Sequence, residues 1–144
     1  MNIFNIKSII KFSIPALITS LILGIILFYL ALFTSQETVF YLNTGLTVFS
    51  FIFAVIISVG LFSAHMKNTI DAVIMGIIVA ILTSFLQSFI INLFMGRFME
   101  SWFNTNIGNQ IILLVFAGVI MAYIGNTYLK EKIHWKIINK CCGE

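Results

Sequence analysis

The stretch Ala72–Gly96, AVIMGIIVAILTSFLQSFIINLFMG, contains no Lys, Arg, Asp, Glu or His. A helix needs about 20 mostly apolar residues to cross the hydrocarbon core of a membrane, and this stretch is long enough. Three further stretches share the property, namely Phe12–Gln36, Thr38–Ala64 and Ser101–Leu129. Together the four stretches predict four membrane-spanning segments separated by short charged breaks.

The composition of the whole chain also indicates a membrane protein. Of its 144 residues, 60% are hydrophobic and 9% are charged, with a mean hydropathy of +1.09, whereas soluble domains are about 25% charged. Backbone groups in lipid must be hydrogen-bonded internally, so only helices and closed barrels span a membrane. The apolar runs lack the alternation of barrel strands. We therefore expect an all-α membrane protein, a four-transmembrane-helix bundle that forms one domain.

The limits of the spans follow from the charged breaks. The expected spans cover about residues 14–33, 42–64, 70–95 and 107–129, and a basic amphipathic tail follows at 130–144. The opening segment would lie at the membrane surface and turn into the first span near Pro15, because proline fits the first turn of a helix. The first apolar run is too long for the core of a signal peptide, so we expect an uncleaved span.

Basic residues are distributed unevenly between the two sides of the predicted spans. Arg97 falls on one side, and the other seven fall on the opposite side: Lys7, Lys11, Lys67, Lys130, Lys132, Lys136 and Lys140. By the positive-inside rule the lysine-rich side faces the cytoplasm. The sequence thus predicts a multi-pass protein of the plasma membrane with both termini cytoplasmic. This placement gives no reason to expect a nucleic-acid partner.

The tail has the pattern of a helix lying on a membrane surface. Lys132, Lys136 and Lys140 recur every four residues beside an apolar stripe that includes Ile133 and Ile137. Together with Lys130, these lysines are candidates for contact with anionic lipid head groups, at about 1 kcal/mol for each lysine near the surface. The alternative is that the lysines only fix the topology of the chain.

Small residues at regular spacing predict where the helices pack. In lipid, close helix contacts need small side chains. The longest ladder, in the third span, consists of Ala72, Gly76, Ala80, Ser84 and Ser88 and continues to Asn92. Shorter ladders are Ala16, Ser20 and Gly24 in the first span and Gly118, Ala122 and Asn126 in the fourth. We expect the third span to be the most buried. A faint likeness between the two halves also suggests two related helical hairpins.

A polar cluster in the outer half of the third span is the best candidate for a site. It consists of Thr83, Ser84, Gln87, Ser88 and Asn92. Residues four apart share a face of a helix, as Thr83 and Gln87 do. These side chains either hold helices together through hydrogen bonds or line a small polar cavity that opens outward. The bilayer and a second copy or another membrane protein are the expected partners.

Residues suited to catalysis are scarce. His65 and Asp71 flank one turn, where Asn68 and Asp71 are better explained as the capped start of the third span. Cys141 and Cys142 form neither a C-x-x-C motif nor an ordinary zinc site. They are interpreted as free thiols, and the alternative is lipidation of a cysteine next to the membrane. No phosphate-binding loop or nucleophile motif is present. We therefore expect no catalytic, cofactor or metal site, and no enzyme.

Comparison with known patterns gives one resemblance. The small multidrug transporters have a carboxylate in their first span, and Phe12–Gln36 has none. The basic start, the glycine-containing third span after a lysine-containing turn, and Gly125-Asn126-Thr127-Tyr128-Leu129-Lys130 resemble small, uncharacterised four-span membrane proteins of archaea and other AT-rich prokaryotes. The resemblance implies a four-span fold and brings no activity. The expected function is a non-catalytic accessory, scaffold or self-associating subunit; the alternative is a small oligomeric transporter or channel using the polar cluster.

Overall fold

Helices are the only regular secondary structure in residues 5–34, 43–94 and 107–130, the part of the chain described by this computed structural model. They are α1 (Ile6–Thr34), α2 (Asn43–Ser63), α3 (Thr69–Phe94) and α4 (Ile107–Ile124), which continues into the π-helical turn η1 (Gly125–Leu129). The expected all-helical fold with four helices is confirmed. Three helices are long and apolar enough to cross a membrane, and the described side chains of α2 form a further apolar stretch at Phe49–Ser63.

The first helix begins earlier than its apolar run predicts. α1 starts at Ile6 rather than at residue 14 and continues through Pro15, so the expected turn of the chain near Pro15 is wrong. The reason is Asn5, whose Oδ1 accepts a hydrogen bond from the Ser8 backbone N–H at 3.2 Å and thereby caps the helix. Pro15 consequently lies inside α1, where its missing N–H removes one backbone hydrogen bond. The position of the first residues at the membrane surface stays a prediction.

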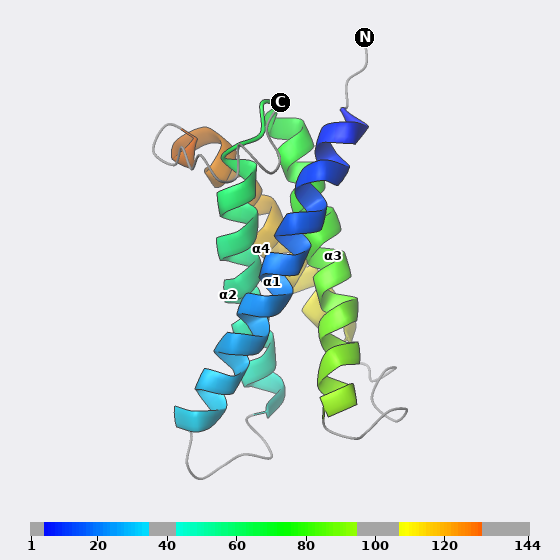
Figure 1. Cartoon of the computed structure of the whole chain (residues 1–144), viewed down its shortest axis with the longest axis vertical. Helices are drawn as coiled ribbons and strands as arrows, with labels where there is room; N and C mark the ends of the chain where they lie inside the picture. Colours follow the sequence, from blue (N-terminus) through cyan, green and yellow to red (C-terminus); the bar gives the residue numbers. More distant parts are fainter. Residues whose placement is uncertain (1–4, 35–42, 95–106, 131–144) are drawn as a thin grey trace.

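Each helix runs antiparallel to the next, and the four form one bundle (Figure 1). α1 packs against α2 and α3, α4 packs against the same two helices, and α2 also contacts α3. In the described part of the chain α1 and α4 have no comparable contact with each other. If the hairpin α1–α2 were related to the hairpin α3–α4 by a twofold axis, the contact between α1 and α4 would match the contact between α2 and α3. The hairpins are therefore not equivalent in how they pack.

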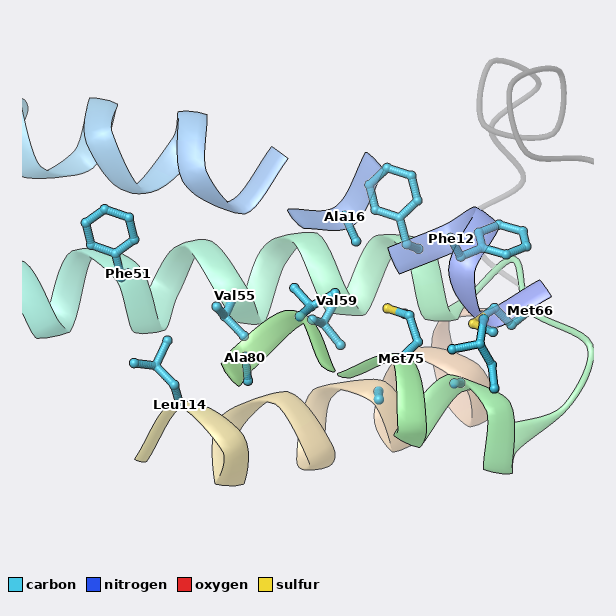
Figure 2. Close-up of a cluster of buried hydrophobic side chains, with 14 residues drawn as sticks. Phe12, Ala16, Phe51, Val55, Val59, Met66, Met75, Ala80 and Leu114 are labelled. Atoms are coloured by element: carbon cyan, nitrogen blue, oxygen red, sulfur yellow. The ribbon is translucent and has the colours of Figure 1, made fainter. Parts of the chain in front are cut away.

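The apolar core lies between α2 and α3 and is completed by side chains of the other two helices. Figure 2 shows Val59 of α2 beside Met75 of α3 and Val55 of α2 over Ala80 of α3, with Ala16 of α1 above and Leu114 of α4 below. Within an 18-residue apolar stretch of each span, 44% of the residues of α3 are buried, against 22% in α1 and 28% in the span formed by α4 and η1. However, more than half of the apolar part of α2 is buried. α2 therefore shares the central position that was expected for the third span alone.

Glycines permit the closest approach between helices. At the crossing of α3 and α4, a Cβ atom added to Gly76 would lie 2.7 Å from the Gly118 carbonyl oxygen, and one added to Gly118 would lie 2.7 Å from the Gly76 carbonyl oxygen. Gly24 of α1 leaves space for the ring of Phe51 from α2. Backbones come this close only where no side chain separates them, as in the contacts between small residues of membrane helices.

The described lysines gather toward one end of the bundle. The Asn5 backbone N–H donates to Asp71 Oδ1 (3.3 Å), and Lys130 Nζ donates to the Lys67 carbonyl oxygen (3.1 Å). These bonds join the start of α1, the α2–α3 turn and the end of η1 at the upper end of Figure 1. Lys7 is exposed in the first turn of α1. We call this the lysine end of the bundle.

Candidate functional site: polar side chains inside the bundle

Two hydroxyl groups connect α1 to α3 in the buried interior. Ser20 Oγ and Thr83 Oγ1 are 2.8 Å apart, and Ser20 Oγ also lies 2.8 Å from the Leu17 carbonyl oxygen. The carbonyl can only accept, so the one hydroxyl hydrogen of Ser20 points to Leu17 and Thr83 must donate to Ser20. The resulting chain of two hydrogen bonds runs from α3 into the backbone of α1. Such chains strengthen one another where the dielectric constant is low.

Gln87 connects α3 to α4 one turn further along. Its side chain is 1% exposed, and its Nε2 donates to Gln110 Oε1 over a long 3.4 Å. The Oε1 atom of Gln87 accepts no hydrogen bond from any residue of the described ranges. A buried amide oxygen without a donor costs about 1–3 kcal/mol. Gln87 is therefore the least satisfied of the described members of the polar cluster.

The remaining members of the cluster contribute less to contacts between helices. Ser84 is buried and its Oγ donates to the Ala80 carbonyl oxygen of its own helix at 2.8 Å. The side chains of Ser88 and Asn92 lie outside the described residues. Within the small-residue ladder, the described members are all buried, namely Ala72, Gly76, Ala80 and Ser84. The structure thus brings Thr83 and Gln87 into hydrogen bonds with α1 and α4, respectively.

Asn126 forms the most complete polar contact in the described chain. Its Nδ2 donates to the carbonyl oxygens of Ser63 (2.8 Å) and Met66 (2.7 Å), and its Oδ1 accepts from Thr69 Oγ1 (2.8 Å). The side chain is 4% exposed and lies in η1. Three of the four hydrogen bonds open to an asparagine are made. One side chain therefore fastens η1 to both sides of the α2–α3 turn.

Sequence reasoning counted Asn126 only as a small residue of a packing ladder. Its partners lie about 60 residues earlier in the chain, and two of them are backbone carbonyls that no side-chain pattern reveals. The neighbouring Gly125 packs against Gly60 and the Ser63 hydroxyl. An asparagine next to a glycine at the end of an apolar run was the signal available. This Gly125–Asn126 pair lies where the α-helix α4 changes to the π-helical turn η1. Such π-helical turns are often found at functional sites.

The turn between α2 and α3 is capped as the sequence predicts. Asn68 Oδ1 accepts from the Ile70 backbone N–H at 3.2 Å, and Asp71 lies in the first turn of α3. Asp71 is 4% exposed and accepts from Asn5, so its carboxylate lies near the starts of both α1 and α3. His65 Nδ1 is 2.9 Å from the Leu61 carbonyl oxygen. His65 and Asp71 thus contact different partners, the Leu61 carbonyl oxygen and the Asn5 backbone N–H.

Ionisable groups suited to a metal ion do not cluster in residues 5–34, 43–94 and 107–130, where no group of three His, Cys, Asp or Glu side chains is found. The tail residues Lys132, Lys136, Lys140, Cys141 and Cys142 lie outside these ranges. Comparison with protein families, curated proteins and solved structures finds no match for this chain. The resemblance to small four-span proteins of prokaryotes thus stays a prediction.

Proposed function

We propose that this protein is a non-catalytic subunit of the plasma membrane that acts as an accessory, a scaffold or a self-associating bundle. One observation carries the proposal: polar side chains in the described interior bond helix to helix, as in the Thr83–Ser20 pair and the three bonds of Asn126. Ionisable residues inside a membrane usually mark a transport path or a proton relay. The charge-free runs of this chain keep such residues at the ends of the helices.

The proposed topology has four spans and both termini in the cytoplasm. The lysine end would face the cytoplasm, following the positive-inside rule. α2 would be the fourth span, since its 21 residues at 1.5 Å each correspond to about 30 Å, the thickness of the hydrocarbon core. Lys130 and the tail lysines beyond it would lie against anionic head groups of the inner leaflet.

Partners would bind in the plane of the membrane. Large apolar side chains cover the outside of the bundle, including Phe53 of α2, Phe85 of α3 and Phe116 of α4. In a membrane these apolar side chains can remain in contact with lipid tails, so the bilayer is the first of the proposed partners. A second copy or another membrane protein would pack against part of this surface. Nucleic acid is not among the proposed partners.

A second function has one specific observation in its favour. Gln87 Oε1 is buried and unpaired among the described residues, and an unpaired polar atom is what a polar cavity or a permeation path would present. The alternative is therefore a small oligomeric transporter or channel that uses Thr83, Gln87 and Gln110. The two functions differ in what Gln87→Leu does: lost assembly indicates a structural contact, and lost flux with intact assembly indicates a lining.

The test combines assembly and flux. The full chain, tagged in its host membrane, should run as a complex larger than one copy after mild crosslinking, because a subunit needs a partner. In proteoliposomes, it should give no solute or ion flux above that of protein-free vesicles. A monomer in native membranes would contradict the proposal. So would a protein-dependent flux that Gln87→Leu abolishes while assembly stays intact.

A further inference from the structure

The Oε1 atom of Gln87 is a buried hydrogen-bond acceptor without a donor among the described residues. It belongs to a residue that is 1% exposed. The large majority of buried side-chain polar atoms in folded proteins have a hydrogen-bond partner, either protein or ordered water. The nearest amide, Gln110, is joined to Gln87 through the other end of the Gln87 side chain, by Nε2. The partner of Oε1 must therefore come from elsewhere.

Thr83 offers a second acceptor on the same face of α3. Its only hydroxyl hydrogen is donated to Ser20, as the contact of Ser20 with the Leu17 carbonyl requires. A hydroxyl oxygen has two acceptor lone pairs, and these remain on Thr83. Residues four apart have Cβ atoms about 5–6 Å from each other on a helix. Two acceptors at this spacing cannot satisfy each other, but one small molecule with two donor hydrogens can join them.

We propose that a single internal water molecule is bound between Thr83 Oγ1 and Gln87 Oε1, inside the outer half of the bundle. Water matches the chemistry because it carries two donor hydrogens and no charge. A cation would need several oxygen ligands and would carry its charge into the apolar interior, where charge is expensive. Internal waters typically make about three hydrogen bonds to buried polar groups. The inference is independent of the proposed function, since a subunit and a transporter could both contain this water.

The water would link polar side chains that come from three helices. Thr83 and Gln87 face the interior, toward α1 and α4. A bound water would complete a hydrogen-bonded chain from Gln110 through Gln87 and Thr83 to Ser20. Three helices would then be joined by one continuous polar network.

Magnetic resonance on the whole chain in phospholipid nanodiscs tests the site. The sequence has three glutamines, Gln36, Gln87 and Gln110, so selective ¹⁵N labelling gives three side-chain amide signals, and Gln87→Met identifies the relevant one. We expect cross-relaxation from water to the Gln87 amide, with the opposite signs in the laboratory and rotating frames that mark a long-lived water. Absence of this signal in the natural protein would overturn the proposal.

Two matched variants separate a bridging water from general hydration. Thr83→Val removes one of the two acceptors, so the water signal at Gln87 should be lost. Ser20→Ala breaks the Thr83–Ser20 bond but leaves the Thr83 oxygen, so the signal should remain. An unchanged signal in Thr83→Val would overturn the bridge. An equally strong water signal at the methyl groups of Leu114, which is fully buried in the apolar core, would also overturn it.

Discussion

At the scale of single residues, the bundle is fastened by neutral polar side chains whose partners are distant in the sequence. The charge-free run already indicated that Thr83 and Gln87 would need partners, because a buried amide or hydroxyl in lipid requires one. The partners themselves, Ser20 and Gln110, could not be predicted, since many polar residues lie at similar depth. Asn126 was harder still because backbone carbonyls leave no trace in a side-chain pattern.

Asn126 should contribute more to stability than the residue beside it. Asn126→Ala removes three hydrogen bonds to other elements, and at about 0.6 kcal/mol for each such bond in a membrane protein the loss is about 2 kcal/mol. Thr127→Ala is the matched control, because the exposed Thr127 bonds only to the Tyr123 carbonyl of its own helix. The free energies of unfolding of both variants, measured by steric trapping in bilayers, check this difference. Equal stability of the two variants would show that the Asn126 contacts are weak.

At the scale of elements, apolar runs predict where helices lie, whereas caps and close contacts set their ends. The second, third and fourth helices begin within one residue of expectation, at Asn43, Thr69 and Ile107. The start of α1 was missed because the capping Asn5 precedes a mixed polar and apolar turn rather than an apolar run. The π-helical turn was missed as well. It forms where Gly125 packs against α2, a contact between distant segments.

The α3–α4 crossing should tolerate no added side chain, whereas another glycine should tolerate one. Gly118→Ala would place a methyl group against the Gly76 backbone, and overpacking of this kind costs about 1–3 kcal/mol. In Gly60→Ala the new methyl meets the flexible end of Met121 at 3.1 Å, so the change should stay within about 0.5 kcal/mol. The thermal unfolding midpoints of the two variants in detergent micelles check this, and the midpoint of Gly118→Ala should be the lower one. A stability loss in Gly60→Ala as large as that in Gly118→Ala would contradict the glycine crossing.

At the scale of the whole molecule, four helices enclose an apolar core, and the charged residues of the described chain lie toward one end. The asymmetric lysines of the sequence predicted that the start of α1, the α2–α3 turn and the end of α4 share one side. The bonds Asn5–Asp71 and Lys130–Lys67 place these segments together. Function could be predicted only as a class, because neutral polar residues serve packing and permeation equally well and no ionisable group selects between them.

The central claim is that all four helices cross the membrane with the lysine end in the cytoplasm. Cysteine labelling in intact cells tests it most directly, using single cysteines at Glu37, Lys67 and Glu100 in a chain whose Cys141 and Cys142 are replaced by serine. We predict that a membrane-impermeant maleimide labels Glu37→Cys and Glu100→Cys from outside and labels Lys67→Cys only after the cells are opened. Labelling of Glu37→Cys and Lys67→Cys from the same side would contradict the claim, because α2 would then not cross the membrane.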